Sequence, residues 1–170
     1  AIILQYLSYK YEIPNLTTTI DHFIGEYSED LLFQSLLFKS NYQSNNDRNT
    51  NETLKLYFNT DKEEQTIITN LSKYIENDQM LLLPISILDR IFDKCSSQTI
   101  QRNSTKITEF LFKCLDKYGI DASILFSHID FEEQSVGVIN RLIENYSKKF
   151  DFNMINSTLL KTTTQLTRES

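Results

Sequence analysis

An all-α fold is predicted for this sequence: an irregular bundle of about eight or nine helices with at most one short strand. Apolar residues recur every three or four positions through most of the 170 residues, which is the spacing of amphipathic helices. Only 3 Gly and 2 Pro are present, too few for the frequent tight turns of a β-sandwich or barrel. The composition, 40% hydrophobic and 24% charged, is that of a globular domain with a sizeable core.

Three short helices are expected in the first part of the chain. The first covers residues 2–11 and ends before Pro14, because a proline disfavours helical geometry in the residue that precedes it. The second covers residues 16–24, with Gly25 as its stop. Ser28 suits the N-cap of the third, which is apolar almost all round and should therefore be the most buried of the three.

A polar stretch rich in Asn, residues 40–53, divides the chain. It has no apolar face to bury and is predicted to be a surface loop. It separates the N-terminal piece, residues 1–39, from a larger helical piece, residues 54–170. The larger piece opens with residues 54–58, whose alternating pattern fits either one short strand or an extended lead-in.

The larger piece carries its own helix signals. Asp61 and Glu64 form a capping-box pattern that opens one helix, and Pro84 suits the first position of the next. A further helix is expected over residues 104–118, with Gly119 directly after its end.

Two more helices are expected toward the C-terminus, together with a defined core. A second capping-box pattern, Asp130 with Glu133, predicts a long helix to about Lys149, and a last helix is expected over residues 157–167. The helical register also places two residues, Ile91 and Phe92, on the face that packs against Ile67, Leu71 and Leu111.

The charge balance argues against nucleic-acid and membrane partners. With 17 Lys and Arg against 23 Asp and Glu the net charge is −6, which repels phosphate backbones, and Lys148-Lys149 is the one adjacent basic pair. No run of about 18 apolar residues exists to span a membrane. Acids gather near predicted helix starts and lysines near helix ends, which complements the helix dipoles. We interpret three acidic pairs as solvated helix-start residues: Glu29-Asp30, Glu63-Glu64 and Glu132-Glu133.

No catalytic, cofactor-binding or metal-binding residues are predicted, and no cofactor is expected. The three glycines are too widely separated to form a phosphate-binding loop. Cys95 and Cys114 lack metal-ligand spacing and are interpreted as two reduced thiols of an intracellular protein. The sequence contains two histidines, His22 and His128, and no motif marks a nucleophile for either. The chain is therefore predicted not to be an enzyme; the alternative is a small hydrolase that uses His128 and a neighbouring carboxylate such as Asp130.

Several aromatic residues fit the apolar stripes poorly. Exposed aromatic side chains are favoured in protein interfaces, and Tyr6, Tyr9, Tyr27, Tyr42 and Tyr57 are the candidates. The first helix also carries more apolar surface than two short neighbours would cover. The predicted protein-binding residues are Ile2, Ile3, Tyr6 and Tyr9.

The order of these patterns is similar to that of a known family. In residues 2–24, apolar residues are followed by a Tyr-x-Ile step, a Leu and a helix ending in Phe-Ile, which resembles the closing helix pair of a BTB domain. Residues 67–92, with Leu81-Leu82-Leu83-Pro84, resemble the helix–turn–helix core of a BACK-type extension, and residues 110–131 resemble its later helices. The Asn-rich loop departs from the family, and no functional residue is carried over. The matching positions of the helix pair are Leu4, Leu7, Tyr11, Ile13, Leu16, Ile20, Phe23 and Ile24.

The BTB–BACK resemblance implies a non-catalytic scaffold or adaptor. Its partners would be proteins, either a second copy of the chain or a cullin-type ubiquitin ligase for which it serves as substrate adaptor. A structural brace in a large stable assembly, such as a cytoskeletal complex, is the alternative. We expect a cytoplasmic protein, a BTB-like segment upstream of Ala1 and, from the abundance of Asn, Ile and Lys, an AT-rich protist genome.

Overall fold

The computed structural model describes residues 1–26, 29–43 and 57–153. Within these ranges every regular element is helical, with nine α-helices, two 3-10 helices and no strand. The predicted all-α class is therefore confirmed. The elements are α1 (Ile2–Lys10), α2 (Pro14–Glu26), α3 (Glu29–Gln43), α5 (Asp61–Thr69), α6 (Leu71–Tyr74), η1 (Asp78–Leu82), α7 (Ile85–Asp93), α8 (Ser97–Arg102), α9 (Ser104–Tyr118), η2 (Gly119–His128) and α10 (Val136–Tyr146).

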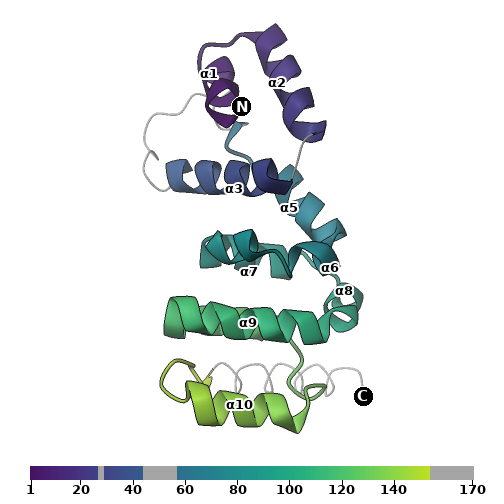
Figure 1. Cartoon of the computed structure of the whole chain (residues 1–170), viewed down its shortest axis with the longest axis vertical. Helices are drawn as coiled ribbons and strands as arrows, with labels where there is room; N and C mark the ends of the chain where they lie inside the picture. The colour runs from purple at the N-terminus through teal and green to yellow at the C-terminus, as the bar shows by residue number, and fades with distance from the viewer. Residues whose placement is uncertain (27–28, 44–56, 154–170) are drawn as a thin grey trace, which may run out of the picture.

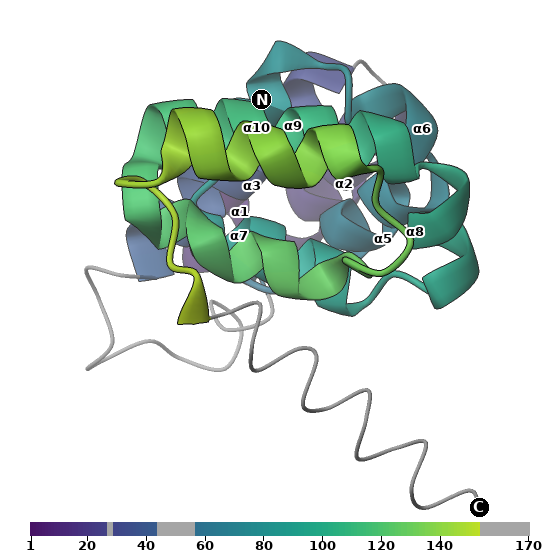
Figure 2. The same cartoon turned by 90° about the horizontal axis from the view of Figure 1, so that it is seen from below.

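The helices are stacked in layers along the long axis of the molecule (Figure 1). The pair α1 and α2 forms one end, and α3, α7, α9 and α10 follow one above another, with α5, α6 and α8 at the side. Seen along the long axis, α10 overlies α9 in nearly the same direction (Figure 2). The most extensive contacts join α9 with η2, α1 with α2, and α7 with η2, and α5 contacts both α3 and α7. Such a stack depends on each layer being fixed to the next.

The core runs through the middle of this stack. α7 buries Ile87, Leu88, Ile91 and Phe92, which recur at helical spacing on one face. Each such buried side chain stabilises the fold by about 1.5–3 kcal/mol. The predicted core is confirmed, because Ile91 and Phe92 belong to the same buried cluster as three residues of α5, α6 and α9: Ile67, Leu71 and Leu111.

The N-terminal piece differs from expectation at its helix ends. Gly25 lies inside α2, which continues to Glu26. The predicted loop over residues 40–53 begins too early, because α3 continues to Gln43. Ser40 donates its hydroxyl hydrogen to the carbonyl of Leu36, one turn earlier, a bond that a helix accommodates. The remainder of that loop lies outside the described residues, as does Ser28.

The possible strand at residues 54–58 lies partly outside the described residues. Its last two residues, Tyr57 and Phe58, are not extended; they are buried in an aromatic cluster with Tyr6 and Phe38. Tyr57 and Phe58 therefore anchor the chain in this cluster.

The predicted long helix from Asp130 to Lys149 is shorter in the structure. Asp130 accepts a hydrogen bond from the backbone N–H of Glu132 at 2.9 Å, so its carboxylate closes a turn instead of opening a helix. The helix α10 begins only at Val136 and ends at Tyr146. The helix expected over residues 157–167 lies outside the described residues.

Candidate functional site

The first helix buries two polar side chains and leaves two large aliphatic side chains exposed. The buried residues of α1 are Ile2, Gln5 and Ser8, spaced three apart along one face. Ile3 and Leu4 are 65% and 54% exposed. An ordinary amphipathic helix buries its apolar face. We call α1 inverted because it buries Gln5 and Ser8, next to Ile2, while Ile3 and Leu4 are exposed.

Hydrogen bonds between α1 and α2 explain this inversion. Gln5 donates to Asp21 at 2.5 Å, and the hydroxyl of Tyr9 donates to the other oxygen of Asp21 at 2.9 Å. Thr17 donates to the hydroxyl of Ser8 at 3.0 Å. Buried polar groups usually find a partner: α2 supplies one for the amide N–H of Gln5 and for the hydroxyl of Ser8, whereas Oε1 of Gln5 is buried without one. The polar seam fixes the rotation of α1 and thereby turns its apolar side outward.

The outward side forms what we call the N-terminal apolar surface. Leu4 of α1 and Tyr11, the residue directly after its end, are both exposed, and Leu7 between them in sequence is half-buried. Further exposed apolar side chains follow at the corner and at the start of α2. The members of the N-terminal apolar surface are Ile3, Leu4, Tyr11, Ile13 and Leu16.

The four predicted protein-binding residues are divided between the two sides of α1. Ile3 lies on the N-terminal apolar surface. Ile2 is 9% exposed, and its carbonyl accepts a hydrogen bond from the hydroxyl of Tyr57 at 3.3 Å. Tyr6 and Tyr9 are half-buried, and both rings pack against the ring of Tyr57. Of the four, Ile3 is the one whose side chain is exposed to a partner.

Among the five tyrosines that the sequence suggested as exposed, the prediction was wrong for one. Tyr57 was expected to be exposed, but it is buried, because four aromatic rings pack around it. Burial raises the pKa of its phenol well above the usual range, with a further rise from the negative charges of Glu63 and Asp21. The side chains of Tyr27 and Tyr42 lie outside the described residues.

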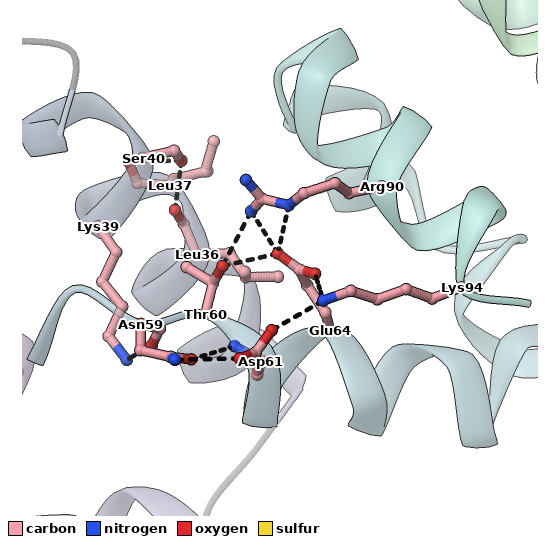
Figure 3. A network of polar contacts seen from close by, with 10 residues as sticks. All are labelled: Leu36, Leu37, Lys39, Ser40, Asn59, Thr60, Asp61, Glu64, Arg90 and Lys94. Carbon is pink, nitrogen blue, oxygen red and sulfur yellow. Dashed lines mark hydrogen bonds and ion pairs between the residues drawn. The ribbon is translucent and has the colours of Figure 1, made fainter. Parts of the chain in front are cut away.

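A second notable group surrounds Glu64 between α5 and α7 (Figure 3). The carboxylate of Glu64 is 0% exposed. It accepts hydrogen bonds from the guanidinium of Arg90 and, at 2.8 Å, from the ammonium of Lys94. The hydroxyl of Thr60 adds a third donor at 2.6 Å, and Lys94 also reaches Asp61 at 2.7 Å.

These donors decide the protonation state of Glu64. Burial alone would raise the pKa of the carboxyl group, but the hydrogen bonds from Arg90, Lys94 and Thr60 together hold it below its usual value. Glu64 is therefore a fixed carboxylate that joins α5 to α7. A carboxylate held by two cations is poorly suited to exchange protons, so the group serves the structure.

The interpretation of Glu63 and Glu64 as solvated helix-start residues was wrong. Thr60 precedes the first residue of α5, so Glu64 lies one turn into the helix and on the face toward α7. Its neighbour Glu63 points to α3, where it pairs with Lys39 at 2.5 Å and accepts from Ser35 at 2.8 Å. Glu63 therefore connects α5 to α3, and Glu64 connects α5 to α7.

His128 pairs with an acid of α7, and neither cysteine is an activated thiol. Nε2 of His128 lies 2.7 Å from a carboxylate oxygen of Asp89, not of Asp130, and joins η2 to α7. Cys95 and Cys114 are free thiols, as predicted. Burial raises the pKa of Cys95 to about 11 and that of Cys114 to about 12, so both thiols are protonated at neutral pH.

A hollow of about 390 Å³ lies next to His128, where α7, α8 and the start of α9 meet. Over the described part of the chain, no three His, Cys, Asp or Glu side chains are arranged to hold a metal ion. Nor does any described helix have the length and apolar character needed to cross a membrane.

Comparison with known proteins yields no relative: no protein-family model, curated protein or solved structure matches this chain.

Proposed function

We propose that the chain is a non-catalytic protein–protein interaction module, an adaptor or scaffold, that binds a protein partner through its N-terminal apolar surface. The observation that carries the proposal is the inverted helix α1, which buries Gln5 and Ser8 and exposes Ile3 and Leu4. A contiguous exposed apolar surface is the usual mark of an interaction site.

The BTB–BACK resemblance supports the same proposal. Residues 2–24 resemble the last two helices of a BTB domain, which in that family pack against the rest of the domain. Four of the matching positions are exposed in this chain: Leu4, Tyr11, Ile13 and Leu16. Their exposure is what the resemblance requires if a further folded body covers them. We therefore propose a BTB–BACK-type adaptor, cytoplasmic, with cullin-type ubiquitin ligases as one class of partner.

The size of the surface sets the expected affinity. Burying one large apolar side chain contributes about 1.5–3 kcal/mol, and the five members are already partly covered. Association also costs at least about 4 kcal/mol in lost translational and rotational freedom. Contact with a second copy through this surface alone should therefore be weak and reversible, and tight binding needs a partner with a larger complementary face.

Site-specific photo-crosslinking tests the proposal. A photoreactive phenylalanine analogue is placed at Leu4 or, as a matched control, at Ile124, an exposed apolar position of η2, which packs against α7 and α9. In cells of the source organism, irradiation should produce a discrete protein adduct from position 4 and none from position 124. Equal labelling from both positions, or none from position 4, would contradict the proposal.

A structural brace is the second candidate, and the acids of α5 favour it. Glu63 and Glu64 fix α5 to α3 and to α7, which stiffens the stack against bending between layers. A brace stays in one assembly, whereas an adaptor exchanges its partner. The two candidates are separated by mixing the complex of the chain and its partner with free chain that carries the photoreactive residue. Exchange of the free chain into the complex within minutes indicates an adaptor, and no exchange over a day indicates a brace.

A further inference from the structure

The hollow beside His128 combines an apolar floor with an acidic rim. Phe92 and Ile129 are buried at its base, and the half-buried Cys95 and Ile100 form an apolar wall. The remaining lining residues are polar, and three of them are acids on the rim: Asp93, Asp130 and Glu133. The hollow is separate from the N-terminal apolar surface, which lies at the far end of the stack (Figure 1).

No cation balances this rim within the described residues. Asp93 has no hydrogen bond or ion pair there, and no Lys or Arg lines the hollow. Lys94 follows Asp93 in sequence but points toward Asp61 and Glu64 (Figure 3). His128, the one other basic group at the hollow, is engaged by Asp89.

The other two acids of the rim are held by neutral donors. Asp130 accepts from the backbone N–H of Glu132, and Glu133 accepts from the side-chain amide of Gln101 at 3.1 Å. Neither contact supplies a positive charge. Three acidic residues therefore line the same hollow, and no Lys or Arg of the described residues lines it with them.

The position of Asp93 is unfavourable for an acid. Asp93 is the last residue of α7, where the negative end of the helix dipole disfavours an acid. It also breaks the general pattern of this sequence, in which acids lie near helix starts. Like charges around one hollow repel each other, and that repulsion is relieved when a cation enters.

We propose that the hollow receives an arginine side chain from a basic segment of a protein partner. The aliphatic part of the side chain would lie on Cys95 and Ile100, and the guanidinium would meet the rim of Asp93, Asp130 and Glu133. A guanidinium offers several donors in one plane and pairs with carboxylates in a bidentate manner. The apolar wall favours such a long side chain, whose aliphatic part it can cover, over a metal ion. A chain with this hollow and the N-terminal apolar surface has two separate contact sites.

The experiment is a ¹H–¹⁵N NMR titration of the full chain with N-acetyl-arginine amide. N-acetyl-citrulline amide, which has nearly the same shape and no charge, is the matched control ligand. The arginine derivative should shift the resonances of residues around the hollow, such as Ile100 and Ile129, with millimolar affinity. The citrulline derivative should leave them unchanged.

Variants separate recognition by the rim from general attraction to an acidic protein. The double variant Asp93→Asn/Glu133→Gln should weaken binding at least fivefold and should melt at or above the temperature of the parent chain. Asp78→Asn, which removes an exposed acid elsewhere, should change neither. Equal binding by citrulline, equal weakening by Asp78→Asn, or displacement of the arginine derivative by stoichiometric Ca²⁺ would each overturn the proposal. These residues do not overlap the N-terminal apolar surface, so failure here leaves the proposed function standing.

Discussion

The buried carboxylate of Glu64 makes a quantitative prediction. Its two cationic partners, Arg90 and Lys94, have side chains that are 45% and 40% exposed, whereas Glu64 is 0% exposed. The double variant Arg90→Met/Lys94→Met therefore leaves a buried negative charge with the hydroxyl of Thr60 as its remaining donor. Removing the partners of a buried charge costs about 3–5 kcal/mol. Because solvent reaches the two cations and screens them, we expect the lower end, about 3 kcal/mol.

The pH dependence of stability should change sign in this variant. In the parent chain the pKa of Glu64 is lowered on folding, so its stabilisation is present above the ordinary value near 4.5 and is lost as the pH falls through the folded value. Without the cations, burial raises the folded pKa instead. The variant should then lose stability as the pH rises above about 4.5, where the unfolded carboxyl ionises more readily than the folded one.

Urea unfolding followed by circular dichroism between pH 4 and 7 measures both effects. Adding Glu64→Gln to the double variant removes the buried charge and should restore about 2 kcal/mol or more and flatten the pH slope. Lys106→Met, which breaks the exposed pair with Glu76, is the control and should cost less than about 1 kcal/mol. A double variant that costs no more than this control, with the pH slope of the parent, would refute the reasoning.

Three further predictions concern the core, the other acid of α5 and the thiols. Ile91→Asp should place an unpaired charge in the core and unfold the domain, with loss of helical circular dichroism at 25 °C; a melting temperature close to the parent value would show that α7 is turned the other way. Lys39→Met leaves Glu63 with Ser35 as its one remaining partner, and it should lower the free energy of unfolding in urea by about 2–3 kcal/mol. A loss under about 0.5 kcal/mol would show that the Lys39–Glu63 pair lies in solvent. Cys114 should resist iodoacetamide at pH 8 in the folded chain and react in urea, because burial raises its pKa to about 12; rapid alkylation of the folded chain would contradict that burial.

The sequence was sufficient to predict the helical class and the core. The apolar spacing in α7 and α9 is long and regular, so the register of Ile91, Phe92 and Leu111 could be predicted before their packing was known. Helix ends were harder to predict, because Ser, Asn and Asp side chains bond to the backbone both inside and outside helices. Asp130 illustrates this: its carboxylate closes a turn ahead of α10.

The candidate site was harder to predict because it depends on polar partners that are distant in sequence. Gln5 and Asp21 pair across 16 residues, and this contact inverts α1 against its apolar pattern. In the sequence, Glu64 resembled a helix-capping residue. The missed signal was the spacing of Arg90 and Lys94, which are four positions apart and so lie on one side of the chain, where an acid can pair with both.

Sedimentation equilibrium of the purified chain tests most directly the claim that the N-terminal apolar surface is an interaction site. The parent chain should self-associate reversibly at tens of micromolar. Ile3→Lys/Leu4→Lys should sediment as a monomer at the same concentrations. The control Ile120→Lys/Ile124→Lys adds the same charge at two exposed apolar positions of η2 and should behave as the parent chain does. A monomeric parent chain, or loss of association in both variants alike, would contradict the account.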